Sequence, residues 1–167
     1  MSRVARFHAD RTNQKLYFAR LACQQVEQIE HVQQAQAYRE AAVFHLHGSL
    51  LAFLQELARY YRLNDSQPTL KSIEEQMADK GQISPEVVVM QQLAKHGFIA
   101  ELKRAYRLCQ YAPEPNAPVP EEETSSNLII KVTQGPQSWL PDVKILREWH
   151  RELTQLIDGF RNEMVEF

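Results

Sequence analysis

The 167-residue sequence has the length of one ordinary domain, and its composition of 44% hydrophobic and 24% charged residues excludes a disordered chain. The 19 basic and 21 acidic residues give a formal charge of -2, which excludes a polybasic nucleic-acid-binding tail. Only five glycines occur, and the glycine patterns of dinucleotide-binding and P-loop proteins are both absent. We therefore expect a single domain, residues 1–167, with no cofactor.

The beginning of the chain and its cysteines predict a cytoplasmic protein that does not enter a membrane. The start, MSRVARFHAD, lacks the apolar run of a secretory signal. The densest apolar stretch, residues 50–54, is far shorter than the roughly 20 residues that span a bilayer. Cys23 and Cys109 form no C-x-x-C pair, which is typical of reduced, buried thiols.

Two long helices are predicted in the first half of the chain, over residues 12–32 and 35–63. Thr12 or Asn13 could cap the first helix through a side-chain oxygen. The second helix is apolar on several faces, which is typical of a central helix with several neighbours. Gly48 in its middle lowers helix propensity by about 1 kcal/mol, so we expect a neighbouring helix backbone to approach closely there.

A short helix and a third long helix are predicted next. Residues 69–80 form a short amphipathic pattern that ends at Gly81. Ser84-Pro85-Glu86 is a good start signal for a helix over 84–110. Its apolar phase continues through Gly97, which predicts one helix bent at this glycine or two helices that meet there.

The segment 111–138 differs from the rest because it holds five of the eight prolines and four acidic residues. It predicts a long loop, and residues 128–133 (LIIKVT) within it are typical of an extended or strand-like segment. A last long helix is predicted over 141–165, with near-heptad apolar spacing that suits a bundle.

The predicted fold class is therefore all-α, a four-helix-bundle-like domain with one short extra helix and a strand-like segment before the last helix. The predicted core consists of the most regularly spaced large apolar residues: Phe18, Val26, Leu46, Leu50, Leu54, Leu57, Leu93, Leu102, Leu146, Trp149, Leu153 and Leu156.

The histidines do not match a metal site, because neither E-x-x-H nor H-x-x-x-H occurs. Arg39 and His45 have the spacing used by the HEPN family of helical ribonucleases, and they are the one catalytic alternative. Six residues place the two side chains some 120° apart around a helix, so the geometry is poor. We therefore predict no catalytic residues and no metal ligands.

Basic residues near two predicted helix ends are candidates for a binding surface: Arg59, Arg62, Lys103, Arg104 and Arg107. Tyrosines interleave with them, and cations beside aromatic rings are what single-stranded nucleic acids use. The same pattern also arises when cations stabilise helix C-termini and tyrosines fill the edge of a core. Nucleic acid is therefore the less favoured partner.

Three motifs together resemble an uncharacterised bacterial family: TNQKLYFARL, the Ser-Pro-Glu start followed by AELKRAYRLC, and LREWHRELTQLIDGFRNEM. This family is a domain of unknown function, some members of which carry a PasA-like label. The resemblance implies a small bacterial cytoplasmic helical protein. It implies no activity and no functional residues.

The favoured function is a non-enzymatic interaction or regulatory protein with an unidentified protein partner. The alternatives are an HEPN-like ribonuclease and a single-stranded nucleic-acid-binding protein. A homodimer is also expected, because residues 128–133 could pair with the same segment of a second copy.

Overall fold

The computed structural model describes residues 3–111 and 140–165, and these form six helices without any strand. The predicted all-α class is therefore confirmed. The helices are α1 (Arg3–Gln28), α2 (Val32–Tyr60), α3 (Leu70–Asp79), α4 (Pro85–His96), α5 (Phe98–Gln110) and α6 (Val143–Val165). The strand-like segment 128–133 and nearly all of the predicted loop lie outside the described residues.

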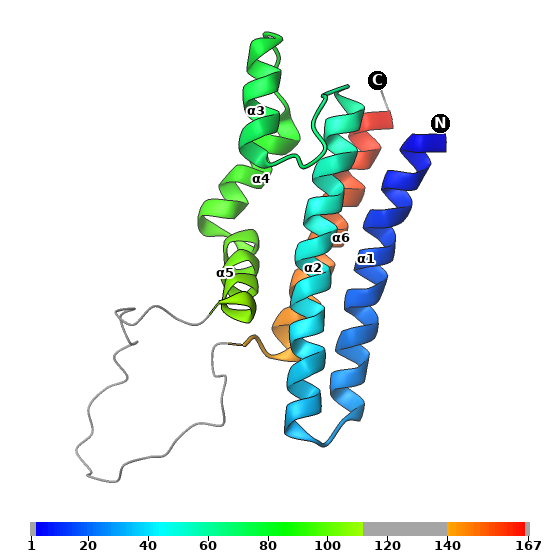
Figure 1. Ribbon diagram of the computed structural model, residues 1–167, viewed down its shortest axis with the longest axis vertical. Coiled ribbons are helices and arrows are strands. Elements are labelled where there is room, and N and C mark those ends of the chain that lie inside the picture. Colours follow the sequence, from blue (N-terminus) through cyan, green and yellow to red (C-terminus); the bar gives the residue numbers. More distant parts are fainter. Residues whose placement is uncertain (1–2, 112–139, 166–167) are drawn as a thin grey trace, which may run out of the picture.

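Helix α2 is the centre of the molecule, as its wide apolar girth predicts. It packs against α1, α5 and α6, and Figure 1 shows α1 and α5 on either side of it with α6 behind. Its fully buried side chains include Leu46, Phe53 and Leu57. The remaining helices are therefore organised around one long, central element.

Helix α1 begins nine residues earlier than predicted, at Arg3, so the predicted caps Thr12 and Asn13 are wrong. Thr12 is instead fully buried within the helix. The buried stripe of α1 also differs in phase from the prediction: it runs through Leu16, Ala19 and Cys23, while Phe18 and Val26 are half-buried. Small residues in this stripe let α1 lie close along α2.

Helix α3 begins with a reciprocal cap, since Thr69 and Ser72 each accept a hydrogen bond from the other's backbone N–H. Helix α4 begins with Ser84 as its cap and Pro85 as its first residue, as predicted. Helices α4 and α5 are separate and meet at Gly97. A Cβ atom there would lie 3.1 Å from Leu93 Cα, so the close approach explains the glycine.

Helix α6 covers the back of α2 with a continuous stripe of apolar side chains. Leu146, Trp149 and Leu153 are buried as predicted, whereas the predicted Leu156 is half-buried. Ile157 takes its place in the core with 0% exposure. The stripe therefore steps by four residues after Leu153 rather than by three.

The end of α2 is joined to the start of α4 by a buried carboxylate. Glu86 is 4% exposed and accepts hydrogen bonds from Tyr61 Oη (2.5 Å) and Ser84 Oγ (2.6 Å). Burial and the hydrogen bond to Glu86 raise the pKa of Tyr61 to about 12. The fold therefore holds the phenol in its protonated form.

This raised pKa predicts a loss of stability at high pH. The unfolded phenol releases its proton near pH 10, whereas the folded one keeps it until about pH 12. The stabilisation is complete below about pH 10 and is lost as the pH rises toward about 12. Urea unfolding should show that the free energy of unfolding falls more between about pH 9 and about pH 11 for the wild type than for Tyr61→Phe. Tyr111 is exposed, so the free energy of unfolding of Tyr111→Phe should fall as much as that of the wild type. An equal fall in all three proteins would contradict the prediction.

Candidate functional site

Arg39, the arginine of the ribonuclease alternative, connects α2 to the segment before α6. Its Nε donates to the carbonyl oxygen of Pro141 at 2.8 Å, and its Nη2 donates to the carbonyl oxygen of Leu140. The guanidinium thus closes the end of the bundle by binding two backbone carbonyls.

His45, its predicted companion, lies among aromatic side chains. Its ring packs edge-on against Phe18 at 5.3 Å and against Phe44 at 5.8 Å. Its Nδ1 is buried and has no hydrogen-bond partner within the described residues. Burial, followed by the positive charges of Lys15 and Arg11, lowers the pKa of His45. The structure therefore surrounds the two side chains with different groups and does not join them in one site.

The five basic residues of the predicted binding surface are all exposed, but they form two separate groups. Lys103, Arg104 and Arg107 lie on α5, which packs beside the middle of α2 because Tyr106 stacks on His47. Arg59 lies twelve residues farther along α2, about 18 Å at 1.5 Å per residue. Arg59 and Arg62 therefore lie at the end of α2, and the three α5 residues lie beside its middle.

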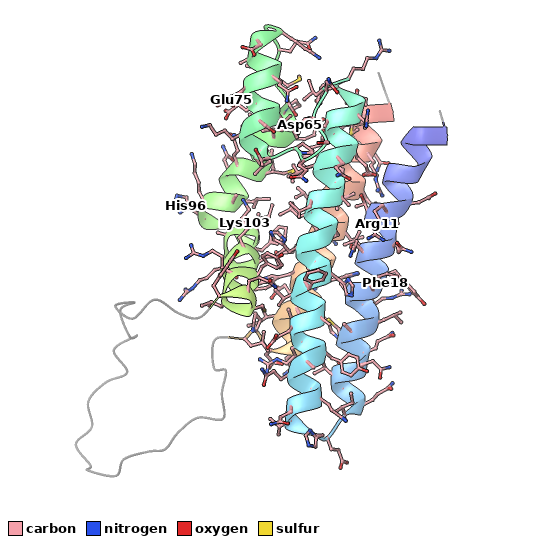
Figure 2. All side chains as sticks on the ribbon, viewed as in Figure 1. Arg11, Phe18, Asp65, Glu75, His96 and Lys103 are labelled. Atoms are coloured by element: carbon pink, nitrogen blue, oxygen red, sulfur yellow. The ribbon has the colours of Figure 1, made fainter. Side chains whose placement is uncertain are left out.

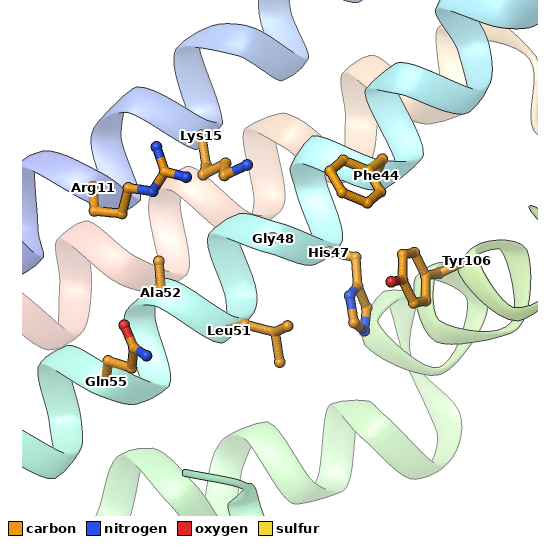
Figure 3. A pocket seen from close by; sticks show the side chains of 9 residues that line it. All are labelled: Arg11, Lys15, Phe44, His47, Gly48, Leu51, Ala52, Gln55 and Tyr106. Carbon is orange, nitrogen blue, oxygen red and sulfur yellow. The ribbon is translucent and has the colours of Figure 1, made fainter. Parts of the chain in front are cut away.

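A groove on the open face of α2 combines residues of three helices and was not predicted from the sequence. Helix α1 forms one wall and α5 the other, and the groove encloses about 260 Å³ (Figure 3). We call it the α2 groove, and its lining residues are Arg11, Lys15, Phe44, His47, Gly48, Leu51, Ala52, Gln55 and Tyr106.

The floor of the α2 groove is apolar and partly open to solvent. Phe44 is 47% exposed and Leu51 is 48% exposed, although both lie on the central helix. Gly48 lies between them, and the side chain of Lys15 lies over it, with Cδ 3.4 Å from where a Cβ would stand. Large apolar side chains grouped in a concave surface are typical of an interaction site.

On the α5 wall, Tyr106 stacks on His47 of the α2 floor. The rings of His47 and Tyr106 stack with centroids 3.8 Å apart and an angle of 6° between their planes. Burial and then the charge of Lys103 lower the pKa of His47, so its ring favours the neutral form. Two flat, stacked rings therefore form this side of the groove, with Lys103 nearby.

The α1 wall is basic. Arg11 and Lys15 are one helical turn apart, and no carboxylate among the described residues forms an ion pair with either of them. Lys15 Nζ lies 5.4 Å from the centre of the Phe44 ring, over the groove floor. Burial and the adjacent Arg11 lower the pKa of Lys15. Figure 2 shows Arg11 and Lys103 on opposite sides of α2.

A second depression of about 520 Å³ lies among α3, α4 and α5. Three lysines line it, but carboxylates lie within or beside it: Lys71 pairs with Glu75 at 3.5 Å, and Glu74 accepts a hydrogen bond from Gln91. Its three lysines are therefore partly offset by two carboxylates, whereas no carboxylate lines the α2 groove.

Other chemistry is sparse in the described part of the chain. Its residues include no group of three histidine, cysteine, aspartate or glutamate side chains arranged to hold a metal ion. Burial raises the pKa of Cys23, and burial with nearby Glu40 raises the pKa of Cys109 to about 11, so both thiols are protonated at neutral pH. None of the described helices is both long and apolar enough to cross a membrane.

Comparison with known proteins identifies a family but no activity. No curated protein and no solved structure matches the chain. A family of unknown function, DUF6586, matches residues 7–167, which include all the residues that form the α2 groove. The chain therefore belongs to the DUF6586 family.

Proposed function

We propose that this protein is a non-enzymatic interaction or regulatory protein of the bacterial cytoplasm, which binds an acidic segment of a partner protein in the α2 groove. The observation that carries the proposal is the combination of an exposed apolar floor with a basic wall that forms no ion pair within the described residues. Both cysteines are free thiols whose raised pKa keeps them protonated, which suits the reducing cytoplasm.

The apolar floor supplies the affinity in this proposal. Covering Phe44 and Leu51 removes apolar surface from water, which contributes roughly 25 cal/mol for each Å² buried. The groove is also shallow and open along α2. A small molecule usually needs a pocket that buries most of its surface, so an extended protein segment suits this shape better.

The basic wall supplies the selectivity. Like charges one helical turn apart destabilise a helix by a few tenths of a kcal/mol, and Arg11 and Lys15 form such a pair. Carboxylates of a partner would offset this repulsion and would match the potential of the groove. Because Lys15 also spans the floor near Phe44, the same contact would order its flexible side chain.

The alternatives have less support. Arg39, which a ribonuclease would need, already donates two hydrogen bonds to backbone carbonyls. The candidate basic residues for nucleic acid lie in two separate groups, and the formal charge of -2 does not favour a polyanion. A homodimer is a further proposal, and the light-scattering experiment in the next subsection would detect it.

Site-specific photo-crosslinking in living cells tests the proposed function. A photoreactive amino acid at Leu51 should give a discrete adduct with one protein, whose crosslinked peptide is rich in aspartate and glutamate. The double variant Arg11→Glu/Lys15→Glu should lower the adduct yield roughly tenfold, since it reverses the charge of the basic wall. The matched double variant Arg59→Glu/Arg62→Glu should leave the yield unchanged.

The placement control is Ile145, which is 42% exposed on α6 away from the groove. The photoreactive residue there should not produce the same adduct. An adduct that persists after Arg11→Glu/Lys15→Glu, or that disappears with Arg59→Glu/Arg62→Glu, would refute the assignment of the α2 groove as the binding site.

A further inference from the structure

The α2 residues of the groove follow a pattern that belongs to helix–helix packing. In a helix pair, a side chain of one helix inserts between four residues of the other, spaced i, i+3, i+4 and i+7. The first such hole in the groove is formed by Phe44, His47, Gly48 and Leu51. The second, one turn farther along, is formed by Gly48, Leu51, Ala52 and Gln55.

The two holes together use every α2 residue that lines the groove. They share an edge, and each contains a small residue on the side facing α1. Gly48 and Ala52 are one turn apart, and small residues at this spacing let a second helix approach closely. The groove is therefore shaped for a helix that lies along α2, between α1 and α5.

No helix of the described residues occupies these holes. The glycine predicts the close approach of a helix backbone to position 48, but the nearest group is the side chain of Lys15, whose Cδ would lie 3.4 Å from an added Cβ. That prediction is wrong within the described part of this chain. A partner that approaches Gly48 must therefore move the flexible side chain of Lys15.

We propose that the partner segment of the α2 groove is an amphipathic α-helix, which places two apolar side chains one turn apart in the two holes and carboxylates against Arg11 and Lys15. This inference rests on the proposed function, because it specifies the form of the acidic partner. The partner helix would cover the remaining open face of α2, which already packs against α1, α5 and α6.

The positions of the charges define the orientation of the partner's acidic side. Arg11 and Lys15 are separated by one turn, as are the two holes, so each carboxylate flanks one inserted apolar residue. On the opposite side the partner meets the flat ring of Tyr106, with Lys103 beyond it. The carboxylates therefore belong on the flank that faces α1, and the α5 flank suits an apolar or small residue.

Binding of designed peptides to the full chain tests this inference. The probe is a fluorescein-labelled peptide of about 18 residues, with leucines at i, i+4, i+7 and i+11 and glutamates along one flank. It should bind with micromolar affinity, become helical on binding and weaken as salt is added. A peptide of identical composition with leucines and glutamates in strict alternation should bind at least about tenfold more weakly.

A variant that fills the first hole gives a matched control within the chain. Gly48→Leu should weaken binding of the helical peptide at least about tenfold, while its thermal midpoint does not fall, because leucine favours a helix over glycine by about 1 kcal/mol. Gly159→Leu makes the same change on α6, where nothing lies within 4 Å of an added Cβ, and should bind normally.

The outcomes separate the two proposals. Equal affinity for both acidic peptides would overturn the helical partner while leaving an acidic partner in place. Loss of binding in Gly159→Leu as well as Gly48→Leu would also overturn the inference. If the wild type is a dimer by light scattering and Gly48→Leu makes it monomeric, a second copy occupies the groove and the separate partner protein is refuted.

Discussion

Replacing Glu56 by glutamine should lower the free energy of unfolding by about 2–4 kcal/mol. Glu56 is a carboxylate on the central helix with only 8% of its side chain exposed. Its single cationic partner among the described residues is Arg161 on α6, whose Nη2 donates to both carboxylate oxygens at 2.7 and 3.0 Å. The amide would remove the closer of the two carboxylates that face the guanidinium and leave only Asp158 Oδ1, at 3.9 Å.

The position of Arg161 makes this interaction important for the whole bundle. Its Nη1 donates to Asn13 Oδ1 at 2.8 Å, and its Nη2 also donates to the carbonyl oxygen of Ala9 at 3.4 Å, so the guanidinium joins α1, α2 and α6. Water reaches its side chain, which is 24% exposed, and this screening places the expected cost below that of a fully buried pair.

Chemical denaturation of a matched pair of variants measures the effect. Arg147 and Glu27 also join α6 to α1, at 2.6 Å, but both side chains are about half exposed. Glu27→Gln should therefore cost at most about 1 kcal/mol. Equal losses for the two variants would contradict the prediction. The double variant Glu56→Leu/Arg161→Met should recover most of the stability, because it removes both charges together.

The sequence predicted helices α2 to α6 to within a few residues because their boundaries have local causes. Ser84 and Pro85 start α4 through a cap and a fixed backbone angle, and both act within one turn. Gly97 separates α4 from α5 through its contact with Leu93, four residues away. Signals that act over so few residues can be recognised in the sequence alone.

The phase of α1 was not predictable in the same way. Phe18 is the larger side chain, yet Ala19 is fully buried and Phe18 is only half-buried. The long contact with α2 selects the face of α1 that allows the closest approach, and small residues provide it. A prediction based on side-chain size therefore selects the wrong face of α1. The correct face follows only when the packing against α2 is known.

The α2 groove was not predictable because its parts come from three helices. The sequence does identify Gly48 and the wide apolar girth of α2, and both observations bear on the site. It does not show that Arg11 and Lys15 lie opposite Tyr106, since more than 90 residues separate them in the chain. Gly48 and the apolar girth of α2 are therefore the sequence signals that point to this site.

Large apolar residues on α2 thus have two roles, which mutation should separate. Phe53 is fully buried and stacks on Phe160 of α6, with ring centroids 6.0 Å apart. Phe53→Ala should lower the free energy of unfolding by about 3–5 kcal/mol, since it leaves a cavity between α2 and α6. Phe44 lies nine residues earlier on the same helix and is 47% exposed. Phe44→Ala should cost less than about 1 kcal/mol.

The same two variants give opposite results when binding is measured. Phe44→Ala removes one edge of the first hole, so it should weaken the helical peptide while leaving the urea midpoint nearly unchanged. Phe53→Ala should shift the urea midpoint strongly, yet its folded fraction should bind the peptide as the wild type does, because Phe53 does not line the groove. Unfolding losses of similar size in both variants would show that Phe44 is part of the core, because a residue kept for a partner contributes little to the stability of the free protein.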